Sequence, residues 1–353
     1  MAERQWRAAV VGVGVVGDWH VQILSKMPNV TLVAVCDPLV DKVKATLATR
    51  GLGHIPVYAL QKQMHSREQL DVVHICTPSG NHMKPAILAM KAGVNVICEK
   101  PMEIKLDRID KMIASASENK VKLAGIFQNR WNLANRALYD AAREGRFGRI
   151  AWGGSITPWY RTDQYYRDGG WRGTWKLDGG GAMMNQSVHN VDLIQWICGP
   201  VETVSAHASS RIHAEIEVED TLSCALTFEN GAHGTIVGTT AIYPGAGVRI
   251  EVGGEFGHAV SEDGLKRFTF KDARPADEAL MTEINTTKPP AAGSAAINQG
   301  LDLHYQNISS ILASWDRGEE AATWGPEARK AIAIILAMYK SAKNSGRSVR
   351  VGS

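Results

Sequence analysis

The stretch RAAVVGVGVVGDWHVQILSKMPNVTLVAVC, residues 7–36, decides the fold of the first part of the chain. An apolar, strand-like run ends at Gly12, and a helical pattern then continues to about Lys26. A second strand-like run follows, from Thr31 to Cys36. A strand, a tight turn, a helix and a second strand in this order predict the first unit of a parallel, doubly wound α/β sheet.

Glycines at positions 12, 14 and 17 form a G-x-G-x-x-G pattern between that strand and helix. In this context glycine lets the backbone approach a pyrophosphate, and the helix start offers free N–H groups to it. The alternative is that the glycines serve only the packing of helix on strand. The predicted cofactor contacts in this turn are Gly12, Gly14, Val15, Val16 and Gly17.

Asp37 follows the second strand, twenty residues after Gly17. An acidic side chain there can bind the ribose hydroxyls of the adenosine half and would repel a 2′-phosphate. It therefore favours NAD over NADP, although Lys42 and Lys44 lie close enough in sequence to leave NADP as an alternative.

Two further segments follow apolar strand-like runs at the carboxyl edge of the predicted sheet. TPSGNH follows DVVHIC (residues 71–76), and Glu99, Lys100 and Pro101 follow VNVIC. Ligands bind at this edge in open parallel sheets. Proline stops strand pairing and would direct Lys100 into the crevice. The predicted cofactor contacts here are Thr77, Pro78, Asn81, His82, Glu99 and Lys100.

The composition of the 353-residue chain agrees with an ordinary soluble globular protein. The 39 basic and 36 acidic side chains nearly balance, so charge gives no reason to expect nucleic acid or a membrane as partner. The five cysteines form no C-x-x-C pair, and the histidines show no zinc spacing. We therefore expect a cytoplasmic protein with free thiols and without a metal.

The pattern changes near residue 124, so we expect two domains, 1–123 and 124–353. The second should be an α+β domain with a largely antiparallel open sheet, because ENGAH reads as a hairpin turn. An exposed sheet face suggests a homodimer or homotetramer. Residues 275–297 read as a long surface excursion. The predicted strands are 150–157, 203–210, 218–228 and 232–242, with helices at 132–144 and 326–344.

The run GGGAMMNQSVHNVD, residues 179–192, predicts a largely buried helix after three glycines. Asn185, His189 and Asp192 are spaced four and then three apart, which places them on one helical stripe. A histidine there can accept a hydroxyl proton near neutral pH, with Asp192 as its charged partner. The alternative is a satisfied core histidine.

A tract of aromatic and arginine side chains, WYRTDQYYRDGGWRGTWKLD, precedes those glycines. Flat rings can stack on a sugar while arginines bind its hydroxyls, although aromatics can equally pack beneath a loop or at a subunit contact. The predicted substrate contacts are Arg130, Trp159, Arg161, Tyr166, Trp171, Arg172, Asn185 and His189.

Together GVGVVG, TPSGNH, EKP and GGGAMMNQSVHNVD resemble the glucose–fructose oxidoreductase / inositol dehydrogenase / rhizopine-catabolism (Gfo/Idh/MocA) family over nearly the whole chain. The resemblance implies a nicotinamide-dependent dehydrogenase of a sugar, sugar derivative or cyclitol. It implies catalytic roles for Lys100 and His189, and a contact of Glu99 with the nicotinamide ribose. It also implies that the glycine triplet leaves room for nicotinamide and substrate.

One position departs from the inositol dehydrogenase pattern, in which the residue four before the histidine is often aspartate. Here it is Asn185, which can orient a hydroxyl or the imidazole but cannot stabilise an imidazolium by charge. Two other functions stay open: an NADPH-dependent ketosugar reductase that uses the same residues, and a non-catalytic dinucleotide-binding regulator. The presence of both Lys100 and His189 speaks against the regulator.

Overall fold

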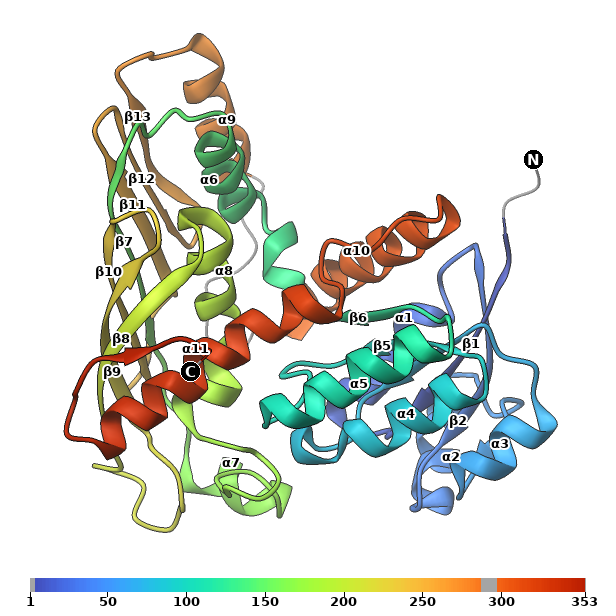
Figure 1. Ribbon diagram of the computed structural model, residues 1–353. Helices are drawn as coiled ribbons and strands as arrows, with labels where there is room; N and C mark the ends of the chain where they lie inside the picture. Colours follow the sequence, from blue (N-terminus) through green and yellow to red (C-terminus); the bar gives the residue numbers. More distant parts are fainter. Residues whose placement is uncertain (1–3, 287–296, 353) are drawn as a thin grey trace. The chain divides into compact units, whose positions relative to one another are not determined.

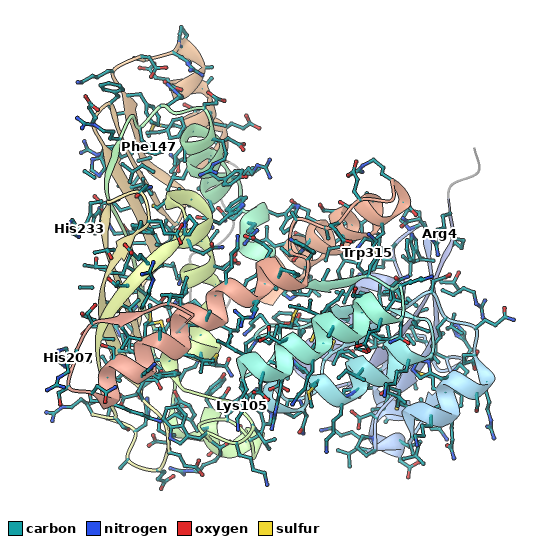
Figure 2. All side chains as sticks on the ribbon, viewed as in Figure 1. Arg4, Lys105, Phe147, His207, His233 and Trp315 are labelled. Carbon is teal, nitrogen blue, oxygen red and sulfur yellow. The ribbon has the colours of Figure 1, made fainter. Side chains whose placement is uncertain are left out.

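The computed structural model describes residues 4–286 and 297–352, and the chain divides into two compact units (Figure 1). The first unit comprises residues 1–126 and 304–329, and the second comprises 127–303 and 330–353. The expected second domain was continuous, whereas here residues 304–329 return to the first unit. Packing explains the return: the ring of Trp315 (Figure 2) lies 5.9 Å from that of Trp6.

The first unit holds the predicted parallel sheet, with six strands in the order β3-β2-β1-β4-β5-β6. The order reverses direction between β1 and β4, which is the point at which dinucleotides bind in doubly wound sheets. The strands are β1 (Trp6–Val11), β2 (Val30–Cys36), β3 (Val57–Tyr58), β4 (Val72–Ile75), β5 (Asn95–Cys98) and β6 (Leu123–Gly125).

Helices connect these parallel strands and cover the sheet (Figure 1). Helix α1 packs on β1 and β2, and α4 packs beside α5. The helices are α1 (Val15–Leu24), α2 (Val40–Thr49), α3 (Gln61–Arg67), α4 (Met83–Lys91) and α5 (Leu106–Glu118), with α10 (Ile297–Asp316) entering the unit at His304.

The second unit holds an eight-stranded sheet in the order β13-β12-β11-β7-β10-β9-β8-β14. All neighbours are antiparallel except β7 and β10, which confirms the predicted fold class. Gly231 supplies the left-handed residue of the predicted hairpin, with φ of +85°. The strands are β7 (Ile150–Pro158), β8 (Val201–Ser209), β9 (Thr221–Phe228), β10 (His233–Thr239), β11 (Arg249–Gly254), β12 (Gly257–Glu262), β13 (Leu265–Phe270) and β14 (Val349–Arg350).

Side chains alternate along these strands, so one face of the sheet is apolar and packed. In β9, Leu222, Cys224, Leu226 and Phe228 are buried. Helices α6, α8 and α9 lie along one face of the sheet in Figure 1. The helices of this unit are α6 (Leu133–Arg143), α7 (Asp163–Gly169), α8 (Val188–Cys198), α9 (Pro275–Thr286) and the main part of α11 (Gly325–Lys343).

The predicted excursion over residues 275–297 is wrong for its first half, because Pro275–Thr286 forms α9. Proline suits a first helical position, acidic residues follow it, and Ile284 is buried on the helix face that meets β13. Residues 287–296 lie outside the described part of the chain.

Two observations concern the chain's general character. The five cysteines are free thiols, and all but Cys76 are buried. Over residues 4–286 and 297–352, no helix combines the length and the apolar surface needed to cross a membrane.

Candidate active site

The glycine turn between β1 and α1 has the geometry of a dinucleotide cradle. A Cβ on Gly12, whose φ is +88°, would lie 2.8 Å from the backbone at Cys76 and Thr77, and one on Gly17 would lie 2.0 Å from the Gly12 carbonyl oxygen. Both positions therefore require glycine for packing. A Cβ on Gly14 would meet nothing within 4 Å, so this glycine leaves open space before the first turn of α1. Val15, which begins α1, is 65% exposed.

Asp37 is held against the glycine turn by two backbone groups. Its Oδ2 accepts the Val13 N–H at 2.8 Å, and its Oδ1 accepts the Leu39 N–H at 2.8 Å. These bonds orient the carboxylate at the carboxyl end of β2. Lys42 and Lys44 are exposed on the neighbouring α2.

The loop after β4 supplies one polar atom that fits a ligand. The Thr77 hydroxyl is buried and has no hydrogen-bond partner among the described residues. A buried hydroxyl of this kind costs free energy unless something binds it. Pro78 is half-buried and Asn81 is exposed on the same loop.

His82, a predicted cofactor contact, is buried between two loops at the carboxyl edge of the sheet. The ring is 1% exposed, with Nε2 at 2.7 Å from the Thr77 carbonyl oxygen and Nδ1 at 3.0 Å from that of Pro101. Its two nitrogens thus join the loop after β4 to the loop after β5. A neutral imidazole carries one N–H, so one of these two contacts is a hydrogen bond that the ring donates.

Glu99 and Lys100 lie at the carboxyl end of β5. Lys100 is half-buried, and its backbone N–H donates to Glu99 Oε2 at 3.0 Å. The other oxygen, Oε1, accepts hydrogen bonds from His20 and His304. Burial alone would raise the pKa of Glu99, but these imidazoles hold that pKa well below its usual range. Neither histidine was predicted, because no local pattern marks them.

In the second unit, the run GGGAMMNQSVHNVD does not form the single helix that was predicted. Ala182–Gln186 is one π-helical turn, and α8 begins only at Val188. The wider turn changes the angular spacing between Asn185 and His189, so the i, i+4 stripe does not apply to this pair. Asn185 instead donates from Nδ2 to the buried carboxylate of Asp178, the residue before the glycine triplet.

Glu219 accepts hydrogen bonds from the backbone at the start of the π-helical turn. Its carboxylate accepts the N–H groups of Gly181 at 3.0 Å and Met183 at 2.8 Å, and the Tyr339 hydroxyl at 2.9 Å. Burial raises the pKa of Glu219 to about 7.

These contacts also explain why glycine is needed at positions of the triplet. The explanation is separate from the predicted one, in which the triplet leaves room for nicotinamide and substrate. A Cβ on Gly180 would lie 2.1 Å from the Tyr339 hydroxyl, and one on Gly181 would lie 1.8 Å from the Glu219 carbonyl oxygen. Gly179 has φ of +79°, which few other residues adopt. The triplet therefore lets the turn pack against its own unit.

His189 lies in the first turn of α8 and is 7% exposed. Its Nε2 is 3.3 Å from the amide nitrogen of Gln128, and the edge of Phe127 faces its ring at a centroid distance of 6.1 Å. An amide and a ring edge hold the imidazole plane while most of its surface is excluded from water.

Asp192 was expected to be the charged partner of His189, and Arg130 was expected to contact substrate. The structure pairs the two with each other: Arg130 Nε donates to Asp192 Oδ2 at 2.7 Å, and Nη2 donates to Oδ1. Both side chains are at most 3% exposed, and the guanidinium lies 5.0 Å from the Trp196 ring centroid. In this buried two-point ion pair the charges of Arg130 and Asp192 balance each other.

The tract between β7 and the glycine triplet forms a half-buried wall of rings and guanidinium groups. Arg161 lies 5.0 Å from the Trp159 ring centroid, and Arg172 lies 4.3 Å from that of Tyr165. Arg161 Nη2 also donates to Gln186 at 2.9 Å. Its buried Nε has no partner among the described residues.

A hollow of about 120 Å³ opens beside this wall. The Tyr166 hydroxyl is fixed by Thr240 at 2.8 Å, and Trp171 is half-buried. The lining residues are Asp163, Tyr166, Arg167, Arg172, Glu215 and Ile216.

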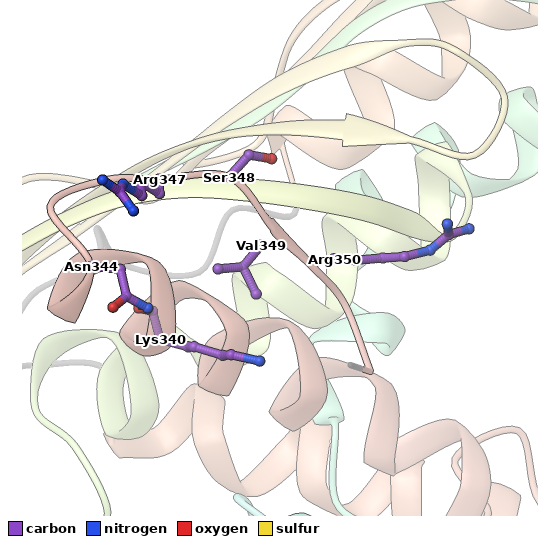
Figure 3. A pocket seen from close by; sticks show the side chains of 6 residues that line it. All are labelled: Lys340, Asn344, Arg347, Ser348, Val349 and Arg350. Carbon is purple, nitrogen blue, oxygen red and sulfur yellow. The ribbon is translucent and has the colours of Figure 1, made fainter.

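A second hollow, of about 380 Å³, lies at the end of α11 (Figure 3). Its side chains are Lys340, Asn344, Arg347, Ser348, Val349 and Arg350. It holds no acid–base pair or aromatic ring, and cations at a helix C-terminus are explained by the helix dipole. It is therefore not a catalytic candidate.

Comparison with known proteins agrees with this division of the chain. Residues 6–127 match the oxidoreductase family with an NAD-binding Rossmann fold, and residues 135–260 match the GFO/IDH/MocA C-terminal domain.

Two solved structures of WlbA dehydrogenases, each in complex with NADH and UDP-GlcNAcA, are similar to almost the whole chain. The Bordetella pertussis structure is 29% identical with a TM-score of 0.90, covering 100% of this chain and 99% of that one. The Chromobactrium violaceum structure is 31% identical with a TM-score of 0.88, covering 99% and 97%. The myo-inositol 2-dehydrogenase of Thermotoga maritima is 25% identical over 98% of both chains.

Proposed function

The chain belongs to the GFO/IDH/MocA family of NAD-binding oxidoreductases, and from this premise we propose that it oxidises a secondary hydroxyl of a negatively charged sugar derivative. Its relatives are dehydrogenases of sugars and cyclitols, and the chain is an NAD-dependent oxidoreductase of this kind. The charge of the sugar, the roles of individual residues and the quaternary state are the new parts of the proposal.

The observation that carries the proposal is the wall of rings and arginines around Arg161. The buried Nε of Arg161 has no hydrogen-bond partner in the described part of the chain, and a guanidinium donor binds carboxylate or phosphate oxygens strongly. Trp159 and Tyr165, over whose rings the Arg161 guanidinium lies, add aromatic surface beside this donor. UDP-GlcNAcA, named with the two WlbA structures, carries both a carboxylate and phosphates.

We assign the proton chemistry to His189 and Lys100. Bound NAD accepts a hydride from the carbinol carbon. His189 takes the hydroxyl proton, since the Gln128 amide orients its ring and the surrounding side chains exclude most water. Lys100 orients and polarises the substrate oxygen. Asp37 supports NAD over NADP as the preferred cofactor.

The test is a panel of substrates measured by nicotinamide absorbance with NAD and NADP separately. We expect turnover with UDP-GlcNAcA and NAD, and little with the uncharged myo-inositol. Lys100→Met should lower kcat/KM by about 100-fold or more while cofactor binding persists. Lys105→Met is the matched control, because Lys105 (Figure 2) is exposed.

Arg161→Met tests whether Arg161 binds the negative charge of the substrate without taking part in the chemical step. It should raise KM for UDP-GlcNAcA by about tenfold, the scale of one charge-assisted hydrogen bond, while kcat falls much less. Arg149→Met is the control, because Arg149 lies outside this wall, is 90% exposed and is already paired with Glu255 at 3.1 Å. Equal KM values in wild type and Arg161→Met, or faster turnover of an uncharged polyol, would refute the proposed substrate class.

We further propose a homodimer or homotetramer that works in the cytoplasm. The outward positions of β9 and β10 carry small side chains, such as Ala225 and Thr235, that another subunit could cover. The five free cysteines suit a reducing compartment. Sedimentation velocity would decide the oligomeric state, and a monomer at micromolar concentration would contradict it.

A further inference from the structure

Four polar side chains converge inside the first unit, around a carboxylate buried at the end of β5. They are His20 of α1, His74 of β4, Glu99, and His304 of α10, and each is at most 4% exposed. Deeply buried polar groups are stabilised by the hydrogen bonds they make, and in the described part of the chain only His74 Nε2 of this cluster has no such partner. Their arrangement therefore restricts which atoms carry protons.

The proton positions follow from the contacts. His20 Nε2 and His304 Nε2 lie 2.9 Å and 3.1 Å from the same oxygen, Glu99 Oε1. An ionised carboxylate only accepts, so both nitrogens carry hydrogen. Burial lowers the pKa of His20, which favours its neutral form.

His74 completes this hydrogen-bond chain. Its Nδ1 lies 2.8 Å from His20 Nδ1. Because a neutral His20 with a proton on Nε2 has a lone pair on Nδ1, His74 must donate there. The hydrogen bonds therefore run in one direction, from His74 through His20 to Glu99.

We propose that His20 and His304 are positioning residues that clamp Glu99 as an oriented carboxylate for the nicotinamide half of the cofactor. The inference rests on the proposed function and on the contact of Glu99 with the nicotinamide ribose that the family resemblance implies. Oε1 is occupied by the two imidazoles, and Oε2 accepts the Lys100 N–H at 3.0 Å. An oxygen with two lone pairs keeps one acceptor site on Oε2 for a cofactor hydroxyl.

His304 matters most for this arrangement, because it comes from a part of the chain 205 residues away from Glu99. The edge-to-face ring contact with Trp19, at 5.6 Å, fixes its orientation against α1. One residue thereby couples α10 to the glycine-turn helix and to the strand end that carries Lys100.

The same three ligand atoms lie within 4.8 Å of one another and could in principle hold a metal ion. The distances favour hydrogen bonds: 2.9 Å and 3.1 Å are normal N–H···O lengths, whereas ligands of a tetrahedral zinc lie about 3.4 Å apart. A metal would also need both Nε2 atoms deprotonated.

The experiment compares His304→Leu with His304→Gln, because a glutamine amide can replace the Nε2–H donor and leucine cannot. Binding of NADH and of ADP is measured by titration calorimetry on the full chain. We expect His304→Leu to weaken NADH by about tenfold, His304→Gln to stay within about threefold of wild type, and ADP binding to be unchanged in both. Tyr305→Phe, an exposed neighbour on α10, is the matched control.

Three results would overturn the proposed clamp, and a fourth would overturn the proposed function alone. Equal NADH affinities in His304→Leu and wild type, or parallel losses of NADH and ADP, would overturn the clamp. One equivalent of zinc in purified wild type and none in His304→Leu would identify a metal centre and overturn it as well. A wild type that binds NADH but oxidises no sugar would overturn only the proposed function.

Discussion

Replacing Asn185 by aspartate tests the contact that the π-helical turn creates. Asn185 donates to Asp178, and the two side chains are 9% and 2% exposed. Asp178 also accepts the Gly173 N–H at 2.9 Å. Asn185→Asp exchanges the amide donor for a second carboxylate in a buried site. Two carboxylates in contact cannot both ionise there, so the pair must retain one proton.

The cost follows from that proton. Holding a carboxyl neutral at pH 7, when its unfolded-state pKa is about 3.9, costs about 1.4 kcal/mol per pH unit, or about 4 kcal/mol in total. Below pH 4 the proton is present in both states, and the protonated carboxyl again donates to Asp178. The destabilisation is therefore small near pH 4 and grows as the pH rises, until the pH exceeds the raised folded-state pKa.

Urea unfolding of wild type and Asn185→Asp between pH 4.5 and 8 measures this difference directly. The double variant Asp178→Asn with Asn185→Asp restores one amide and one carboxylate in reversed positions, and should recover most of the loss. A difference in unfolding free energy that is independent of pH would refute the buried pair. So would a double variant no more stable than the single one.

Other substitutions test the remaining supports of the site. Glu219→Gln should remove a pH dependence of the unfolding free energy. In wild type the folded state keeps a proton on Glu219 up to about pH 7, whereas the unfolded chain releases it near pH 4.5. Between these pH values the unfolding free energy of wild type, measured with urea, should therefore fall by about 1.4 kcal/mol per pH unit relative to the variant. Gly181→Ala would place a Cβ 1.8 Å from a carbonyl oxygen and should sharply lower the melting temperature. Gly14→Ala adds its Cβ in open space, so it should keep the melting temperature but weaken NADH binding. A low melting temperature for Gly14→Ala together with a normal one for Gly181→Ala would contradict both assignments. Arg130→Met should cost about 3–5 kcal/mol by leaving the Asp192 charge buried, and a joint Asp192→Leu change should restore part of it in the same unfolding assay.

The local patterns of the sequence predicted the fold well. The glycine turn, the apolar strands and the hairpin glycine each depend on neighbours within a few residues, and the corresponding elements formed. Two segments differ from the prediction, and packing contacts explain both. The π-helical turn at Ala182–Gln186 follows two glycines that pack against Tyr339 and Glu219. Helix α9 forms where Ile284 is buried.

The sequence predicted which chemical groups belong to the candidate site. It predicted less well which of these groups contact one another. Lys100, Glu99, His189 and the arginine tract were identified because their residue types follow strands or recur near glycine-rich turns. His20, His304, Asp178 and Glu219 were missed because each is an ordinary residue in its own segment. The His304 pattern LHYQN, for example, contains nothing that points to Glu99.

The sequence by itself determined where the chain forms strands, turns and helices, because those depend on backbone conformation and on periodic burial over short distances. Only the tertiary structure decided which buried charges meet. Arg130 and Asp192 are 62 residues apart, and Glu99 and His304 are 205 apart. A buried charge must find its partner in space, and the partner is chosen by how the sheets and helices pack. For that reason the sequence predicted the kinds of chemical group at the site, while the fold decided which of them meet.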